Sequence, residues 1–452
     1  MTTSVGVAPA TVTPAPAVRR AGWRSRLEGE TTPARLRLLL ALLILLCLAW
    51  GALAALTADQ HASAAADVVA VSEPLSLDAE QIYTSLSDAD AIAASAFLAG
   101  GLEPAEARQR YQADIAQAAV RIEAASALVG SSAARTEMPG HPAGQTSAAG
   151  SAVGDDLAIL SGQLPVYTDE VGTARADNRL GLPLGAAYLR EASALLRGTL
   201  LPAASDIYTR ESAQLTSASA QATGLPLIVI AVVAGLALGY VLYRSSRWLS
   251  RHTHRVVNYG LLLAGLAGLV SLVWLASAFV IGRGDLLHAQ QQGSAPVQAF
   301  ARAEVAALRA HADESLTLID NKGDDSYQED YLAQQKLLGP GPGSLLAATG
   351  SSQAAAQAQA WYQAHKALRE QDDAANHPAA VTSAQTGDAA RSFARLSATL
   401  SEGIGTHQAT FAASARGGRD AFTGLAVGMI VASLVMVAGC VWGLSRRLAE
   451  YR

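Results

Sequence analysis

The run LLLALLILLCLAWGALAAL, residues 38–56, decides the fold class, because its 19 residues are apolar or small and none carries a charge. As an α-helix, a run of this length spans the hydrocarbon core of a bilayer, which is about 30 Å thick. Three further runs share this character, at residues 225–243, 259–281 and 421–444. The sequence therefore predicts four transmembrane helices.

The composition agrees with a helical membrane protein and excludes a soluble cytosolic enzyme. Of the 452 residues, 50% are hydrophobic, 16% are charged and only 5% are aromatic. Apolar content supplied by Ala, Leu, Val and Gly is typical of helices and not of β-sandwich cores. The two cysteines, Cys47 and Cys440, both lie inside apolar runs. We expect an all-α fold whose parts outside the membrane contain no disulfide.

The distribution of arginine predicts the orientation, because cytoplasmic segments next to spans are enriched in Lys and Arg. Residues 58–223 carry 20 acids and 9 arginines, and residues 283–419 carry 14 acids and 11 bases. Both segments are therefore predicted to be extracytoplasmic, in a plasma-membrane protein with both termini in the cytoplasm. The arginines beside the spans are Arg19, Arg20, Arg24, Arg26, Arg35 and Arg37, then Arg244, Arg247, Arg251 and Arg255, and finally Arg446, Arg447 and Arg452.

The cytoplasmic pieces are short. Residues 1–37 read as a disordered basic tail, residues 244–258 as a basic loop and residues 445–452 as a second tail. The first span is predicted to be an uncleaved anchor, because it is long for a signal peptide and follows a long tail. Cleavage near Ala52 to Ala55 is the alternative. No cytoplasmic piece is large enough for an enzyme domain.

Both extracytoplasmic segments read as helix throughout, and the antiparallel helical bundle is the architecture that fits. Each is predicted to be a four-helix, sensor-like module, and the two resemble copies of one unit. Asp90 follows the first span by 33 residues, and Asp313 follows the third by 31. Chance recurrence in an Ala-rich chain is the alternative. The predicted helices are residues 62–100 with a bend near Pro74, 103–129, 155–177 and 184–222, with a loop at 139–154, and then 295–319, 327–338, 353–373 and 384–415, with a break at 339–343.

The spans themselves contain packing signals and no ionisable group. Gly235 with Gly239, and Gly424 with Gly428, are GxxxG pairs that let two helices approach closely. The absence of charge in the middle of every span argues against a transporter, a proton relay or an ion channel.

No catalytic or metal-binding constellation is present. The nine histidines are scattered without an HExxH motif, and there is no Walker A loop, GxSxG elbow or kinase signature. We expect no catalytic residues, no metal, no cofactor and no nucleic-acid partner.

Polar clusters are the candidate binding sites. Arginine forks at the helix–turn–helix corner around Gly181 and Pro183 are suited to grip a carboxylate of a ligand or partner. The alternative is that these groups pair within the bundle, as buried polar groups usually do. The basic loop suits a cytoplasmic partner or lipid headgroups. The candidates are Asp90, Tyr111, Arg175, Asn178, Arg179, Tyr188, Arg190, Asp313 and Glu314, and in the loop Arg244, Arg247, Trp248, Arg251 and Arg255.

Three phrases carry a resemblance to a known family. They are YTSLSDADAIAASAFLAGG (83–101), YTDEVGTARADNRLGLPLGAAYLREAS (167–193) and ARAEVAALRAHADESLTLID (301–320). Together with the four-span layout, they resemble the actinobacterial four-pass membrane proteins of the GlnX type. The resemblance implies an extracytoplasmic solute-binding lipoprotein, loaded with an amino acid such as glutamate, aspartate or glutamine, and a cytoplasmic Ser/Thr protein kinase as partners.

The function that follows from the resemblance is a signal relay without enzymatic activity. The layout is also similar to the sensor domains of bacterial chemoreceptors, although the coiled-coil output domain of those receptors is missing here. A direct small-molecule sensor and a scaffold of the cell envelope stay open as alternatives. The sequence also leaves the oligomeric state open, a homo-oligomer included.

Overall fold

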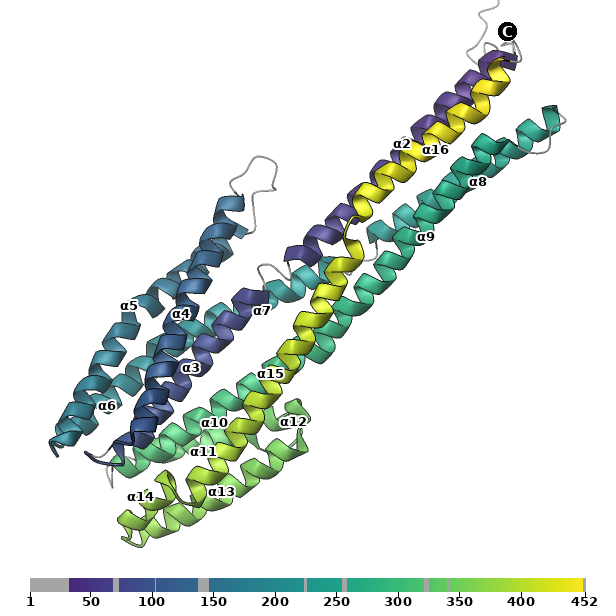
Figure 1. Ribbon diagram of the computed structural model, residues 1–452. Helices are drawn as coiled ribbons and strands as arrows, with labels where there is room; N and C mark the ends of the chain where they lie inside the picture. The colour runs from purple at the N-terminus through teal and green to yellow at the C-terminus, as the bar shows by residue number, and fades with distance from the viewer. Residues whose placement is uncertain are drawn as a thin grey trace, which may run out of the picture. The chain divides into compact units, whose positions relative to one another are not determined.

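The computed structural model describes residues 32–67, 73–101, 103–136, 146–222, 226–253, 258–320, 325–339 and 341–449 (Figure 1). Within these ranges every regular element is a helix and none is a strand. Four helical stretches are long and apolar enough to cross a membrane, and each overlaps one of the four predicted spans. The prediction of an all-α membrane protein is confirmed. The predicted tail up to residue 31 lies outside the described residues.

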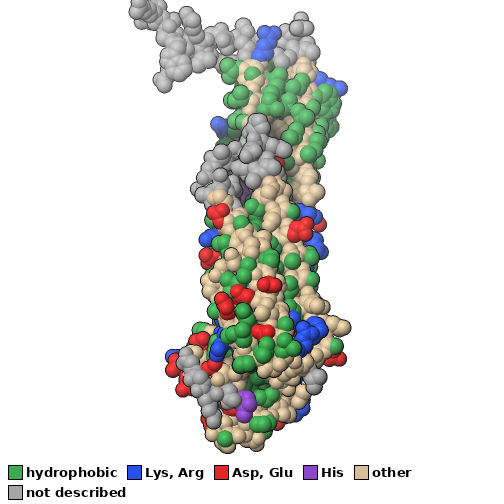
Figure 2. Space-filling model, turned by 90° about the vertical axis from the view of Figure 1, so that its left-hand side faces the viewer, with side chains coloured by type: hydrophobic (Ala, Val, Ile, Leu, Met, Phe, Trp, Pro, Cys, Tyr) green, Lys and Arg blue, Asp and Glu red, His purple; other side chains and the backbone are tan. Residues whose placement is uncertain are grey.

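The chain divides into two compact units. The membrane unit comprises residues 1–54, 231–273 and 427–452, and the bundle unit comprises residues 55–230 and 274–426. Figure 2 shows closely spaced hydrophobic side chains on the surface of the membrane unit, where leucines such as Leu45 are 65% exposed. A surface of this kind is stable only in contact with lipid.

Helices α2 (Thr32–Asp67), α8 (Pro226–Thr253), α9 (Tyr259–His288) and α16 (Leu425–Ala449) carry the four spans. Helices α9 and α16 meet through glycines. A Cβ atom on Gly260 would lie 2.4 Å from the backbone of Gly443, and one on Gly439 would lie 2.7 Å from the carbonyl oxygen of Gly260. This contact is therefore open only to residues without a side chain.

Helix α2 contacts both α8 and α16. The Trp50 indole donates a hydrogen bond of 3.0 Å to the carbonyl oxygen of Ala231, and a Cβ atom on Gly235 would lie 2.7 Å from the Trp50 Nε1 atom. On the other side, the Ser433 hydroxyl donates to the carbonyl oxygen of Cys47 at 3.0 Å. These bonds satisfy polar groups in an environment without water.

The predicted GxxxG pairs behave differently from each other. Gly235 packs on Trp50 as expected, whereas a Cβ atom on Gly239 would meet none of the described residues within 4 Å. The prediction for Gly424 was wrong, because this residue has a φ of +75° and forms the turn between α15 and α16. The close helix contact in this unit uses Gly439 and Gly443, a GxxxG pair that the sequence analysis did not single out.

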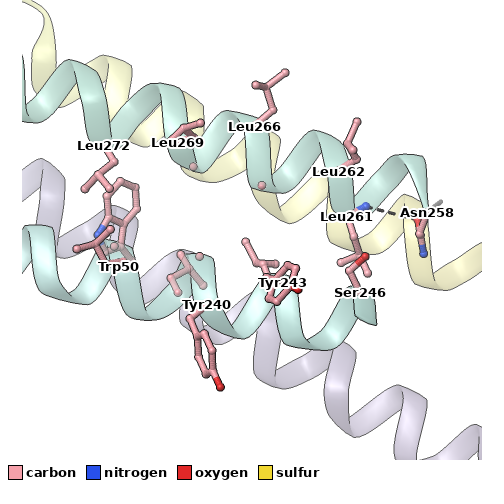
Figure 3. A pocket seen from close by; sticks show the side chains of 17 residues that line it. Trp50, Tyr240, Tyr243, Ser246, Asn258, Leu261, Leu262, Leu266, Leu269 and Leu272 are labelled. Carbon is pink, nitrogen blue, oxygen red and sulfur yellow. Dashed lines mark hydrogen bonds between the residues drawn. The ribbon is translucent and has the colours of Figure 1, made fainter. Parts of the chain in front are cut away.

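An apolar groove of about 850 Å³ separates α8 from α9 (Figure 3). Trp50 and Leu272 lie at one end of it, and Asn258 and Ser246 lie toward the other. Side chains such as Leu266, which is 56% exposed, line the groove. Its surface suits hydrocarbon, the solvent of this unit, and not a water-soluble ligand.

The first module of the bundle unit consists of α3 (Glu73–Phe97), α4 (Ala105–Thr136), α5 (Thr146–Arg179), α6 (Leu184–Leu195), η2 (Leu196–Leu200) and α7 (Leu201–Ala222). Helices α6, η2 and α7 form one rod, and η2 is a π-helical turn. The rod packs on α5, and α3 packs on α4 and α7. The apolar faces enclose a core that includes Leu86, Leu160, Tyr167, Leu189 and Ile207.

The second module begins where α9 continues through the π-turn η3 (Ala289–Ser294) into α10 (Ala295–Asp320). It continues with α11 (Ser326–Leu338), α12 (Leu345–Thr349), α13 (Ser352–Asp373), α14 (His377–Gln385) and α15 (Asp388–Phe422). The hydroxyls of Ser344 and Ser351 cap the first turns of α12 and α13. The fully buried Trp361 and Tyr331 lie in the core.

The two modules share one hydrophobic interior. Leu316 of α10 belongs to the core of the first module, and Ala91 of α3 belongs to the core of the second. Helix α10 also packs directly on α3 and α6. The bundle unit is therefore a single body in which α10 lies against both modules.

Most predicted helices are observed within a few residues. Helix α10 ends at residue 320 where 319 was predicted, and α13 differs from its prediction by one residue. Four boundaries were wrong: α4 ends at Thr136 where 129 was predicted, α5 begins at Thr146 inside the predicted loop 139–154, Thr386 with Gly387 interrupts the predicted helix 384–415, and α15 then continues to Phe422. A weakly apolar, Gly-rich helix start and a short break both leave little trace in hydrophobic periodicity.

Candidate functional site

A polar stripe on the α6–η2 rod forms the candidate site. Arg190, Ser193 and Arg197 are spaced by three and four residues, so they lie on one face of the rod. Each contacts an aspartate on another helix: Arg190 contacts Asp320, and the other two contact the pair predicted from the repeat, Asp90 and Asp313. We call these six residues the interface ladder.

Arg197 lies between the two modules. Its Nε atom is 3.6 Å from the Asp90 Oδ2 atom in α3, and its Nη1 atom is 2.5 Å from the Asp313 Oδ1 atom in α10. The hydroxyl of Ser193 donates to the other oxygen of Asp90 at 2.5 Å. Both aspartates are almost completely buried, at 3% and 1% exposure. One guanidinium thus compensates two buried carboxylates from different modules.

The ladder has an internal direction. Arg197 follows Arg190 by seven residues in the sequence. Their partners are in the reverse order, because Asp313, which pairs with Arg197, precedes Asp320 by seven residues. Seven residues are about two turns of helix, or about 10.5 Å. The matched spacing shows that the α6–η2 segment and α10 run antiparallel along this contact. A shift of one helix along the other would therefore disturb the ion pairs Arg190–Asp320 and Arg197–Asp313 together.

Burial and charge oppose each other at this site. Burial raises the pKa of Asp313 to about 6, even though Arg197 acts to lower it. Burial acts to lower the pKa of the Arg197 guanidinium, but the carboxylates of Asp90 and Asp313 outweigh burial and raise it. The ladder therefore depends on close contact between its charges, and separating them leaves buried ions uncompensated.

The predicted helix–turn–helix corner forms where expected, with Gly181 in the left-handed region at a φ of +69°. The Arg175 guanidinium lies 3.2 Å from a Glu103 carboxylate oxygen and 3.9 Å from the centre of the Tyr111 ring. The Asn178 amide donates to the carbonyl oxygen of Phe97 at 2.8 Å, which ties the end of α5 to the end of α3.

These corner contacts are internal to the first module. The open space at the corner is only about 10 Å³, less than a small ligand requires. Arg179 is exposed at the rim, and the half-buried Tyr188 packs against the core. A ligand role for the corner residues stays a prediction.

Glu314 lies apart from the ladder, in the interior of the second module. It is completely buried, and one of its oxygens is 2.7 Å from the His365 Nδ1 atom while the other is 3.5 Å from the His311 Nδ1 atom. His311 stacks on Phe393 and His365 on Tyr331, with ring centres 3.9 and 3.5 Å apart. Among the described residues, no group of His, Cys, Asp and Glu is arranged to hold a metal ion.

The histidines set the charge state of this carboxylate. Burial acts to raise the pKa of Glu314, but the close contacts with His311 and His365 outweigh burial and lower the pKa to about 2. Glu314 is therefore a buried carboxylate that stays ionised at physiological pH.

The candidates from the basic segment belong to the membrane unit. Helix α8 extends to Thr253, so this segment continues the second span as helix. Arg244 is exposed, Arg247 donates to the Tyr243 hydroxyl at 3.1 Å, and Trp248 is 37% exposed. Arg251 is helical without a described side chain, and Arg255 lies outside the described residues.

Three residues that complete the ladder, Ser193, Arg197 and Asp320, were not among the predicted candidates. A signal was present, because Arg197 lies beside the buried Leu196 and continues the spacing of Arg190 and Ser193. An arginine on a helix face that otherwise points inward requires a buried partner. The identity of that partner could come only from the tertiary structure.

Comparison with known families bears on the first module. The model of the actinobacterial sensor domain matches residues 64–220, which reach from the end of α2 to the end of α7. This match supports a sensor-type actinobacterial protein. No curated protein and no solved structure matches the chain. The matched segment contains Asp90, Arg190, Ser193 and Arg197 of the interface ladder, and α10 supplies its other two aspartates.

Proposed function

We propose that the chain is a non-enzymatic signal relay of the plasma membrane, which passes extracytoplasmic amino-acid status to a cytoplasmic Ser/Thr protein kinase. A solute-binding lipoprotein would be the outer partner, as the resemblance implies. The observation that carries the proposal is the position of Arg197, inside a sensor-type module and in contact with a buried aspartate of the second module. A signal that repositions the sensor module must act on this contact.

The π-helical turn gives the contact a means of changing. Arg197 belongs to η2, a five-residue π-turn between two α-helical segments. Such turns hold one extra residue relative to an α-helix, and they are frequent at functional sites. Conversion of η2 to α-helix would rotate the residues on one side of it relative to those on the other. Arg190 and Ser193 of the interface ladder precede η2 and Arg197 lies inside it, so this rotation would change the contacts of the ladder.

Helix continuity gives the change a route. Residues 259–320 form one helical stretch that contains both a membrane-competent segment and Asp313. Continuous helices pass on small displacements, on the order of 1–2 Å, as rigid elements. A ligand or partner shifts such an equilibrium only by its different affinity for the two states. The loaded lipoprotein is proposed to bind one ladder geometry more tightly than the other.

Charge supports the choice of partners. Residues 58–223 carry 11 more acids than arginines, so a basic face on the outer partner would be attracted to them. The exposed Arg244, Arg247 and Trp248 would meet the kinase, and anionic lipid headgroups compete for the same surface.

The test is recovery of partners from native membranes. The intact protein is purified after gentle solubilisation, with and without glutamate, aspartate or glutamine, and co-purifying proteins are identified by mass spectrometry. We expect a solute-binding lipoprotein and a Ser/Thr kinase, in amounts that change with the amino acid. Recovery of neither would contradict the relay.

A matched pair of variants links the result to the ladder. In Arg197→Gln, the amount of kinase should no longer depend on the amino acid, because the connection between modules is lost. In Arg110→Gln, which removes an exposed arginine of the same module that is not among the candidate binding residues, the dependence should persist. Equal behaviour of the two variants would show that the signal bypasses Arg197.

A further inference from the structure

A cavity of about 320 Å³ lies between the two modules, where α3 and α7 face α10, α11 and α12. This volume is at the lower end of the range for small-molecule sites, about 300–1,000 Å³, and suits a small metabolite. The cavity is separate from the corner and from the Glu314 cluster. No residue of the sequence-predicted set lines it.

Two arginines of α10 give the cavity its charge. Arg302 and Arg309 are seven residues apart, two helical turns, and both line the cavity. Among the described residues, neither forms an ion pair with a carboxylate, in contrast to Arg175, Arg190 and Arg197. Glu80 is the acidic residue in the lining, and burial raises its pKa to about 7. The positive charge is therefore compensated only in part at neutral pH.

Polar atoms without partners lie at the same place. Within the part of the chain that the structure describes, the buried hydroxyl of Tyr208 and the buried Nε atom of Arg309 have no hydrogen-bond partner. The Arg309 Nη2 atom donates to the Tyr83 hydroxyl at 2.8 Å, which fixes the guanidinium beside the cavity. Buried polar groups in folded proteins nearly always have partners. These two atoms are therefore available to a bound molecule.

Part of the remaining wall is apolar. Val305, Ala306 and Leu337 line the cavity beside the arginines. An inorganic anion would pair with the guanidinium groups and leave this wall without contact, whereas an organic acid would cover both surfaces. We propose that the cavity binds a small organic carboxylate, with its oxygens on Arg302 and Arg309 and its carbon chain on Val305 and Leu337.

This inference rests on the proposed sensor function and deepens it, because it assigns the signal to a molecule bound directly between the modules. Helices of both modules line the cavity, so a ligand there would bind best at one relative position of the two. Such differential binding is what a sensor requires.

The test measures ligand-dependent stability of the full-length protein in lipid nanodiscs. Thermal unfolding is followed with butyrate, succinate, n-butylammonium and inorganic phosphate, each up to about 10 mM, since a ligand that binds the folded state raises the Tm. We expect butyrate, succinate or both to raise the Tm in a saturable way, with no effect of n-butylammonium and a weaker effect of phosphate.

Three variants locate the effect. Arg302→Gln and Thr209→Glu alter exposed positions of the cavity lining, and each should weaken carboxylate binding about tenfold or more. Arg395→Gln, at an exposed position of α15 outside the lining, should leave it unchanged. The second cavity variant adds a negative charge without removing a contact of the core, so a folding defect in one variant does not decide the result.

Three outcomes would overturn the proposal. They are no stabilisation by either carboxylate, stabilisation that both cavity variants retain, and stabilisation by phosphate as strong as by the carboxylates. A negative result in this experiment does not change what is expected for the amino-acid-dependent recovery of the lipoprotein and kinase. The cavity proposal and the relay proposal can therefore be contradicted separately.

Discussion

Asp90 and Asp313 share one guanidinium, that of Arg197, although the two aspartates belong to different modules. In the sequence the two residues form a pair because each follows a span at a similar distance. The structure shows that they are paired physically, by a residue of a third element. The interface between the modules is therefore built from the positions that made the modules look alike.

Removal of Arg197 should destabilise the bundle unit strongly. Arg197→Gln leaves the buried carboxylates of Asp90 and Asp313 without their cation, and breaking a buried ion pair costs about 3–5 kcal/mol. Denaturant unfolding of the full-length protein in detergent measures the loss. Arg179→Gln is the control, with an expected change within about 0.5 kcal/mol. If the variant is as stable as this control, the ladder contributes nothing. Adding Asp90→Asn and Asp313→Asn to Arg197→Gln should restore part of the stability.

Replacement of Glu314 should disrupt the second module. Glu314→Gln removes the carboxylate that His311 and His365 share, and we expect a loss of about 3 kcal/mol, because buried donors are left with a poorer acceptor. Near-UV circular dichroism should also change, since Trp361 and Tyr331 pack against these histidines. Glu402→Gln, at an exposed position of α15, should alter neither signal. An unchanged near-UV spectrum in Glu314→Gln would contradict this account.

Stability should fall as the pH rises from about 5 to about 7.5. Burial raises the pKa values of Glu80 and Glu304 to about 7 in the folded protein, above the value near 4.5 that they have when unfolded. In this window the folded state holds more protons than the unfolded state, so a rise in pH favours unfolding. Thermal unfolding should therefore give a Tm several degrees higher at about pH 5.5 than at about pH 8.

The variant pair Glu80→Gln with Glu304→Gln should reduce this slope, because neither position can then titrate. Part of the slope should remain, since burial also raises the pKa values of Glu73 and Asp114 to about 7. The effect of Glu314 on stability has the opposite pH dependence. Its lowered pKa contributes stability above about pH 4.5, and this stability is lost as the pH falls toward 2. The Tm should consequently pass through a maximum near pH 5. A Tm that rises steadily up to pH 8 would contradict the assignment of Glu80 and Glu304.

Two glycines of α9 should respond differently to enlargement. A Cβ atom on Gly260 would lie 2.4 Å from the backbone of α16, whereas one on Gly265 would meet nothing within 4 Å. Gly260→Leu should therefore lower stability by at least about 1–3 kcal/mol through overpacking, and Gly265→Leu should be tolerated. Thermal unfolding of both variants in the same detergent compares them directly. Equal destabilisation would mean that the groove beside Gly265 is closed by another helix.

Much of the fold could be predicted because the signals are local. The absence of charge between residues 38 and 56 requires a spanning helix wherever the rest of the chain lies. Helix α10 could be placed to within one residue, since its apolar positions recur every three or four residues. Gly424 was misplaced for a related reason: a glycine in a turn at the end of a span has the same sequence pattern as one that packs on a neighbouring helix.

The sequence by itself determined the membrane class and the helical content, and it singled out Asp90 and Asp313, because each of these follows from hydrophobic pattern or repeated position. Only the tertiary structure decided what those aspartates bind. Arg197, Asp90 and Asp313 come from three helices far apart in the chain, and the cavity beside Arg302 and Arg309 requires five helices from both modules. Such contacts depend on how helix faces pack across long loops, which local periodicity does not encode.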